Sequence, residues 1–221
     1  MFKKLYMLFK IGRKLSTSGA ISSIYEIYDP PVVIKVLFFI IGFNIKDRKN
    51  SEKLSPGAKL CTALQEMGTT FIKLGQFLAT RPDIIGESIA LELEKLQDKL
   101  PAFNTFEAKK IIKKEIGEKQ FNNIIEISEP IAAASIAQVH IAKIKNENGN
   151  KEVAIKILRP NIEKLFNEEL DALMLFAYII ENTLSKAKRL KLVEVVYLLR
   201  EITNIEMDLR FEAAAANELY E

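Results

Sequence analysis

The 221-residue sequence is poor in the side chains that build disulfides and metal sites, with one cysteine and one histidine. The single cysteine, Cys61, excludes an internal disulfide and a cysteine-cluster metal site, and it fits a reducing compartment. His140 has no second histidine or cysteine ligand near it in sequence, so we expect it to position its own loop by hydrogen bonding. Neither residue predicts a metal site.

Glycine is also scarce. The nine glycines lie at least seven residues apart, and this spacing excludes the G-x-G-x-x-G and Walker A phosphate loops. No Asp-x-Gly triplet occurs anywhere. The metal-binding Asp-Phe-Gly of protein kinases is therefore missing from this sequence, and no Mg²⁺ ligand can be assigned.

Acidic residues are missing from the start of the chain. No Asp or Glu precedes Glu26, whereas five basic residues do: Lys3, Lys4, Lys10, Arg13 and Lys14. A helix through this segment carries one apolar face, formed by Phe2, Leu5, Phe9 and Gly12. The pattern favours a basic amphipathic helix on an anionic membrane surface. A transit peptide and a helix packed on the rest of the domain are the alternative interpretations.

Long hydrophobic runs are absent too. The apolar run 32–43 is short and carries Lys35, whereas a membrane-spanning helix needs about 20 apolar residues. The run therefore favours an interfacial or buried helix. The net charge of +3 gives no case for nucleic acid as a partner.

The sequence does contain an ordered series of helix and strand patterns. We divide it into a basic and apolar segment (1–50), a helical extension (51–123) and a mixed region (124–221). Apolar residues three and four apart predict one long helix that Pro82 ends: Leu60, Leu64, Met67, Phe71, Leu74 and Leu78. Further helices are predicted over about 86–99 and 105–116.

The pattern changes after Ile124. Residues 139–145 and 152–158 predict strands, joined by a hairpin turn at Asn148-Gly149. The remaining residues, 161–220, again predict helices. Helices, a small sheet and more helices in this order indicate an α+β fold.

The second of these strands contains a lysine, Lys156, between apolar residues. Alternation places Val153, Ile155 and Ile157 on one face and Lys156 on the other. A buried lysine needs an acid or a phosphate to meet its charge. Protein kinases place such a lysine in a V-A-I-K strand, where it holds nucleotide phosphates and pairs with a helix glutamate. A lysine that reaches solvent from an edge strand is the alternative.

The acidic partner would come from the C-terminal helices. Asp208 and Glu212 are four residues apart and would share a helix face, while Glu206 would point elsewhere. Apolar neighbours and the run Ala213–Ala216 indicate close packing here. A solvated acidic face is the alternative.

The long N-terminal helix carries a second polar group. Lys73 and Gln76 are three residues apart and lie off the apolar seam. Gly75 lies between them, at a cost of about 1 kcal/mol relative to alanine in a helix interior. A glycine there indicates the close approach of another element or of a ligand.

Over about residues 55–221, these motifs resemble the UbiB family of atypical kinase-like proteins. The family's pattern is matched in order by Lys73-Leu74-Gly75-Gln76, Arg81-Pro82-Asp83, Leu96-Gln97-Asp98 with Pro101, the alanine-rich stretch before Gln138-Val139-His140, Val153-Ala154-Ile155-Lys156, Arg159-Pro160, and Glu206-Met207-Asp208 before Glu212. Each motif is short, but the ordered set is specific.

The resemblance implies a helical extension followed by a truncated, protein-kinase-like small lobe. It implies binding of ATP or ADP, with Mg²⁺ expected for a full family member. Lys156 would hold the phosphates and pair with Glu212. The implied nucleotide-binding residues are Ala132, Ala133, Ala134, Ser135, Ile136, Ala137, Gln138, Val139, Lys156 and Glu212. A family-specific cluster of Lys73, Gln76, Glu206 and Asp208 would cover the place of a protein substrate.

The resemblance also implies a role in ubiquinone biosynthesis at a membrane. The expected location is the cytoplasmic face of a bacterial inner membrane, with a mitochondrial location as the alternative. The expected partners are the membrane surface, ubiquinone-biosynthesis proteins or lipids, and a separately encoded C-terminal lobe.

Three functions remain open from the sequence. The chain is part of a UbiB-type ATPase or kinase, a non-catalytic fragment that binds membranes or partners, or a helical scaffold on a membrane surface. We hypothesise that the 221-residue chain has no ATPase activity by itself. Hydrolysis that Lys156→Ala abolishes would contradict this hypothesis.

The run 132–137 stands where a phosphate loop would ordinarily contain glycine. Glycine reaches positive φ at little cost, and alanine does not. We therefore expect a short helix, whose free N–H groups would meet an anion at its N-terminus.

Overall fold

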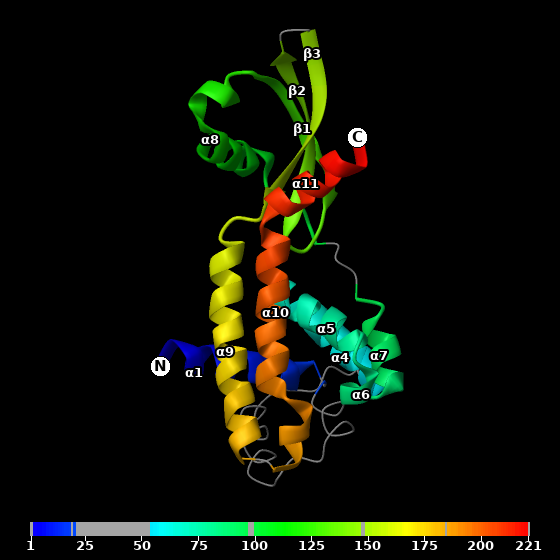
Figure 1. Cartoon of the computed structure of the whole chain (residues 1–221). Coiled ribbons are helices and arrows are strands. Elements are labelled where there is room, and N and C mark those ends of the chain that lie inside the picture. The colour runs from blue at the N-terminus through cyan, green and yellow to red at the C-terminus, as the bar shows by residue number, and fades with distance from the viewer. Residues whose placement is uncertain are drawn as a thin grey trace. The chain divides into compact units, whose positions relative to one another are not determined.

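The computed structural model describes residues 2–18, 20, 54–96, 100–146, 149–183 and 185–220. The chain forms two compact units, each made from two segments (Figure 1). Residues 1–97 and 164–204 form the helical unit, and residues 98–163 and 205–221 form the sheet unit. These units cut across the three predicted ranges, whose functional assignment stays a prediction. The apolar run 32–43 and the charged stretch 46–53 lie outside the described residues.

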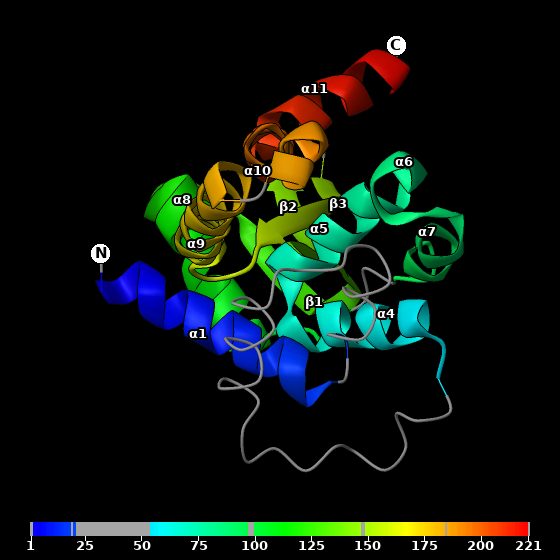
Figure 2. The same cartoon turned by 90° about the horizontal axis from the view of Figure 1, so that it is seen from below.

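Packed helices make up the helical unit. They are α1 (Phe2–Thr17), α4 (Pro56–Met67), α5 (Thr69–Ala79), α6 (Pro82–Ile85), α7 (Glu87–Leu93), most of α9 (Ile162–Thr183), the 3₁₀ helix η2 (Ser185–Leu190) and most of α10 (Leu192–Met207). α1 packs against α4 (Figure 2). Large apolar side chains fill the interior, among them Ile72, Leu93, Phe166, Leu170 and Leu199. In the part of the chain that the structure describes, no helix has the length and apolarity required to cross a membrane.

The long helix predicted before Pro82 is wrong in one respect, because the chain breaks at Gly68. Gly68 has φ +100°, a backbone conformation that residues with a Cβ rarely adopt. It ends α4 and begins α5, and the N–H groups of Phe71 and Ile72 donate to its carbonyl at 3.1 and 3.0 Å. The predicted apolar seam nevertheless persists, since Leu60, Leu64, Met67 and Phe71 are all buried.

Gly75 has the packing reason that its position predicts. A Cβ built on it would lie 2.2 Å from Cδ1 of Leu96 and 2.9 Å from Cδ1 of Leu64. No side chain fits at this distance. The glycine therefore allows α5 to approach the segment that follows α7.

The sheet unit contains α8 (Thr105–Phe121), β1 (Ile124–Ala133), β2 (Ala137–Asn146), β3 (Gly149–Leu158) and α11 (Leu209–Tyr220). The three strands form one antiparallel sheet in the order β1-β2-β3. β2 and β3 confirm the two predicted strands, and Asn146 pairs with Gly149 at their hairpin. Asn148 lies outside the described residues. Strand β1 was not predicted. The helical region and the small sheet confirm the α+β class.

Helix α8 covers one face of the sheet. Ala108 and Ile112 of α8 are buried against Ile157, and the half-buried side chains around them include Phe103, Ile127 and Ile155. The predicted alternation in β3 is therefore present, because Ile155 and Ile157 share the covered face. Lys156 projects from the other face.

The C-terminal helices are interrupted at Asp208. α10 ends at Met207 and α11 begins at Leu209, while Oδ1 of Asp208 accepts a hydrogen bond from the Arg210 N–H at 3.1 Å. The predicted common face of Asp208 and Glu212 on one helix is therefore wrong, since the aspartate caps a new helix. No residue of α11 is buried, so the run Ala213–Ala216 is also not closely packed.

Candidate nucleotide site

Lys156 of β3 and Glu212 of α11 form an ion pair. The Nζ of Lys156 lies 2.5 Å from Oε2 of Glu212, and the two side chains are 36% and 59% exposed. An ion pair with this exposure contributes only about 0–1 kcal/mol to stability. The contact instead orients the ammonium group and connects α11 to the sheet (Figure 1).

Strand register surrounds Lys156 with apolar side chains. Residues directly opposite each other in an antiparallel pair point to the same face. Val139 of β2 pairs with Lys156 on one side and with Ala132 of β1 on the other. The next pair on this face is Ile141 with Ala154. The sheet therefore presents a lysine within an apolar surface that α8 does not cover.

The sequence interpretation included Val139 and Ala132 among the nucleotide-binding residues. It placed Ala154 on the face of Lys156 but left both Ala154 and Ile141 out of that set. Both missed residues are exposed, and Ile141 is 38% accessible. The period-two alternation of β2 and β3 contained the signal that could have found them.

The alanine-rich stretch is a tight connection between two strands, so the expected short helix is wrong. Ala132 and Ala133 end β1, and Ala137 begins β2. The N–H of Ala134 donates to the Ala137 carbonyl at 2.8 Å and closes the connection. Ala132 and Ala133 pair with residues of β2. Their backbone N–H and C=O groups are therefore bonded within the sheet and are not available for a helical turn.

The predicted loop residues differ in their exposure. Ala132 is exposed, and Ala133 and Ala134 are half-buried. The following four residues are buried: Ser135, Ile136, Ala137 and Gln138. A ligand could therefore contact only the first half of this loop. The buried second half anchors the loop in the sheet unit.

Gln138 and His140 form a buried polar chain beneath the loop, and both side chains are completely inaccessible. Oε1 of Gln138 accepts from the Phe103 N–H at 2.9 Å, so its Nε2 is the donor to Nε2 of His140 at 2.8 Å. Nδ1 of His140 then donates to the carbonyl of Ser128 at 2.8 Å. These contacts require a neutral imidazole with its proton on Nδ1. Gln138 therefore supports the loop from within.

Arg159 holds the loop from the end of β3. Its Nε and Nη2 donate to the Ala134 carbonyl at 3.0 and 2.8 Å, and Nη2 also contacts the Leu100 carbonyl at 3.3 Å. Its backbone N–H donates to the Ile136 carbonyl at 2.8 Å. Partial burial lowers the pKa of the guanidinium from its ordinary value, and the group remains protonated at neutral pH. The sequence interpretation had included Arg159 only as part of a motif.

The residues of the predicted family-specific cluster are divided between the two units. Lys73 and Gln76 are half-buried on α5, in the helical unit. Glu206 and Asp208 belong to the sheet unit, where Arg210 binds Asp208 through two side-chain hydrogen bonds. This contact lowers the pKa of the Asp208 carboxyl below its ordinary value. A cluster of all four residues stays a prediction.

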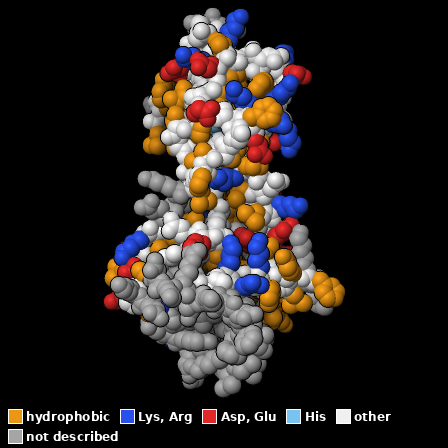
Figure 3. Space-filling model, turned by 180° about the vertical axis from the view of Figure 1, so that it is seen from behind, with side chains coloured by type: hydrophobic (Ala, Val, Ile, Leu, Met, Phe, Trp, Pro, Cys, Tyr) orange, Lys and Arg blue, Asp and Glu red, His pale blue; other side chains and the backbone are white. Residues whose placement is uncertain are grey.

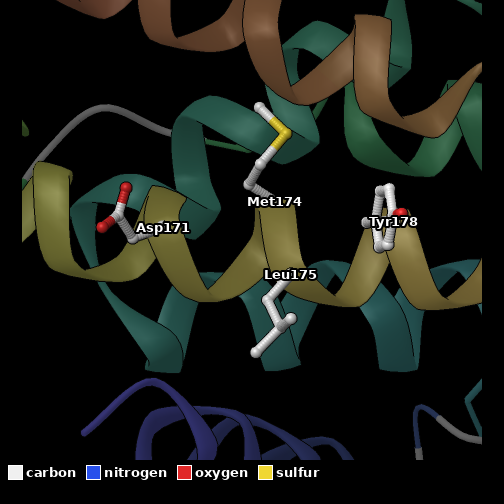
Figure 4. Close-up of a pocket in the computed structure, with 4 residues that line it drawn as sticks. All are labelled: Asp171, Met174, Leu175 and Tyr178. Atoms are coloured by element: carbon white, nitrogen blue, oxygen red, sulfur yellow. The ribbon is translucent and has the colours of Figure 1, made fainter. Parts of the chain in front are cut away.

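Two depressions lie in the helical unit. One is lined by Gln76, Ala79, Thr80, Leu93, Glu94 and Leu96. The other lies on α9 and is lined by Asp171, Met174, Leu175 and Tyr178. Figure 4 shows Met174 and Leu175 pointing to opposite sides of α9, and Arg200 of α10 binds Asp171 at 2.7 Å. The residues on α9 therefore do not converge on a ligand.

Within the described ranges, no three His, Cys, Asp or Glu side chains come together to hold a metal ion. The Mg²⁺ expected for a full family member stays a prediction. Among the described residues of the face shown in Figure 3, acidic, basic and hydrophobic side chains are all present.

Comparisons with known proteins agree with the motifs. The family profile described as the ABC1 atypical kinase-like domain matches residues 95–221. The chain is 38% identical over 190 residues to a protein of Marinobacter nauticus, 36% identical over 197 residues to one of Azotobacter vinelandii, and 41% identical over 168 residues to one of Pseudomonas aeruginosa. Each of these relatives is named probable protein kinase UbiB.

The matched regions cover 86%, 87% and 76% of this chain but 34%, 36% and 31% of the relatives. The chain therefore spans about a third of the length of the curated relatives that it matches. The profile covers more than half of the chain, and the identities exceed a third over most of it. The chain belongs to the UbiB family of ABC1 atypical kinase-like proteins.

Proposed function

We propose that the sheet unit binds ATP or ADP, as the small lobe of a UbiB-type atypical kinase or ATPase. The observation that carries this proposal is the Lys156–Glu212 ion pair on the sheet face that α8 leaves open. Protein kinases use a strand lysine, paired with a helix glutamate, to hold nucleotide phosphates. The apolar side chains of Val139 and Ala154 beside it suit the flat face of a base.

The test is nucleotide binding by the 221-residue chain, measured by calorimetry with ADP and ATP, with and without Mg²⁺. We expect Lys156→Ala to weaken binding by about tenfold or more, because a charged contact to the phosphates is lost. Glu212→Gln should weaken it less, since the lysine remains. The matched control is Lys151→Ala, which removes an exposed lysine from the same strand.

Because the Lys156–Glu212 pair is exposed, these substitutions should leave the unfolding midpoint nearly unchanged. Binding that is equally strong in Lys156→Ala and in Lys151→Ala would contradict the proposed site.

We further propose that α1 rests on an anionic membrane surface. Ile11 and Gly12 are buried in the helical unit, so Gly12 of the predicted apolar face is covered. The other three residues of that face remain exposed, with Phe2 85%, Leu5 46% and Phe9 48% accessible. The sequence left two interpretations of this helix open, packing on the rest of the domain and contact with a membrane. This helix packs through Ile11 and Gly12 and leaves the apolar side chains of its N-terminal half available, which supports a membrane contact.

At the level of the whole protein, we propose a supporting role in ubiquinone biosynthesis at a membrane, on the basis of the family. The proposed partners are the membrane surface and the proteins or lipids of that pathway. A non-catalytic module that only binds membranes is the second candidate, and the uncovered face of α1 favours it. Vesicle binding without any nucleotide binding would select this second function.

A further inference from the structure

We propose that Arg159 is the positioning residue of the alanine-rich loop, and that it sets the affinity of the nucleotide site. This inference rests on the proposed nucleotide binding. It concerns a residue that lies outside the Lys156–Glu212 pair and has no predicted contact with the nucleotide.

The first step is to identify the hydrogen-bond donors of the Ala134 carbonyl. Ala133 is the last residue of β1 that pairs with β2, through Gln138. The Ala134 carbonyl therefore follows the end of the ladder. Arg159 supplies its hydrogen bonds, with Nε at 3.0 Å and Nη2 at 2.8 Å. A half-buried carbonyl without such a donor would be costly.

The second step is that Arg159 connects several segments of the sheet unit. The Arg159 side chain binds Ala134 at the start of the connection, and its backbone N–H binds Ile136 at the middle. Nη2 also contacts Leu100, in the segment that leads to α8. Arg159 therefore fixes the loop from two sides and ties it to a third segment of the sheet unit.

The third step is the choice of side chain. A guanidinium is planar and has donors at fixed angles, so two of them can meet one carbonyl while a third contact reaches another. A lysine ammonium keeps the charge but lacks this fork. Alanine already restricts the backbone more than glycine does, and the arginine removes freedom that remains. The loop is thereby pre-organised, which reduces the entropy lost when a ligand binds.

The position of the loop connects Arg159 to the nucleotide. Arg159 follows Lys156 by three residues, and β3 pairs Leu158 with Ala137, the first residue after the connection. The first half of the loop is the part that a ligand can reach, and Ala134 ends it. A shift of Ala134 would therefore move the part of the loop that a nucleotide could reach, and the affinity should change.

The experiment compares Arg159→Lys and Arg159→Ala with wild type and with Arg189→Lys, an exposed arginine of the helical unit. Two measurements are made on the 221-residue chain: hydrogen exchange over residues 132–140, and binding of ADP and of ATP. We expect exchange of the loop amides to accelerate by about tenfold in Arg159→Lys, because charge-assisted hydrogen bonds are lost. The affinity for ADP and for ATP should fall, and Arg189→Lys should change neither the exchange nor the affinity.

Addition of guanidinium ion at low millimolar concentration should partly restore loop protection and affinity in Arg159→Ala. A residue with only a general structural role would lower the unfolding midpoint without changing the affinity of the folded protein or the exchange of the loop. Unchanged loop exchange in a folded Arg159→Lys protein would overturn the positioning role. If wild type binds no nucleotide, the proposed function and the claim about affinity both fail, while the exchange data still decide whether Arg159 orders the loop.

Discussion

Gly75 is a position where the absence of a side chain decides how closely α5 can pack. We predict that Gly75→Ala destabilises the protein by about 1–3 kcal/mol through overpacking, even though alanine is the better helix former by about 1 kcal/mol. The physical reason is the 2.2 Å approach of a new Cβ to Leu96. Urea unfolding followed by circular dichroism measures the change.

The control for this prediction uses Leu96. In a Leu96→Ala background the nearest clash is absent, so Gly75→Ala should cost less than it does in the wild type. Equal costs in the two backgrounds would show that the contact with Leu96 is not the cause.

The buried Gln138 is a second residue whose loss has a defined cost. Gln138→Met keeps the volume but leaves the Phe103 N–H and Nε2 of His140 without these partners. We predict a loss of about 2 kcal/mol or more in the free energy of unfolding, measured by urea titration. Gln120→Met, at an exposed position of α8, is the matched control and should change little. Similar losses in both variants would argue against the buried chain.

At the scale of single residues, the sequence predicted partners best where a family pattern or a local spacing fixed them. Gly75 and the Lys156–Glu212 pair are such cases. Gln138 and Arg159 were not assigned these contacts, because the backbone groups that they bind lie 35 and 59 residues away, at Phe103 and Leu100. A backbone carbonyl leaves no signal in the sequence.

At the scale of elements, Asp208 decides where α11 begins. We predict that the first turn of α11 loses helicity on acidification, and that Asp208→Asn, which keeps the capping oxygen, loses less. The Arg210 guanidinium holds the pKa of the Asp208 carboxyl below its ordinary value. The contribution of the ionised cap is therefore complete above the unfolded pKa of about 3.9. It disappears as the pH falls through the lowered folded pKa.

The measurement for α11 is the Cα chemical shift of Leu209–Glu212 between pH 6 and pH 2. The difference between wild type and Asp208→Asn isolates this carboxyl from other acid titrations. Identical titration curves would contradict the role of Asp208 as a charged cap.

The regular elements were predictable and the irregular ones were not. β2 and β3 alternate cleanly and are joined at Gly149, so their pairing followed from the sequence. β1 was missed because register shifts interrupt its pairing with β2, between Ile124 and Glu126 and again on both sides of Pro130, which obscures its alternation. The alanine-rich stretch was predicted as a helix from local preference, but strand pairing overrides that preference.

At the scale of the whole molecule, the two proposed activities belong to different units. We predict that Tyr6→Ser with Phe9→Ser weakens binding to anionic vesicles by roughly tenfold or more, because two aromatic side chains no longer enter the interface. Both side chains are exposed on α1, at 68% and 48%. Co-sedimentation with vesicles of phosphatidylglycerol and phosphatidylcholine measures the effect.

The matched control is Phe106→Ser, which removes an exposed phenylalanine from α8 of the sheet unit. It should leave vesicle binding unchanged, and the α1 variant should leave nucleotide affinity unchanged. Equal loss of vesicle binding in both proteins would show that α1 is not the contact. Binding by the wild type should weaken with salt, since lysines surround the apolar face.

Each of the two units is built from two separate segments of the chain, and this has a consequence during synthesis. Each unit combines an early segment with a late one, and the second segments begin at residues 164 and 205. On the ribosome, the strand that carries Lys156 emerges 56 residues before Glu212 does. The exposed lysine face of the sheet therefore exists for a time without the helix that pairs with it. A stalled product shorter than 212 residues would therefore present an unpaired ammonium on an apolar surface.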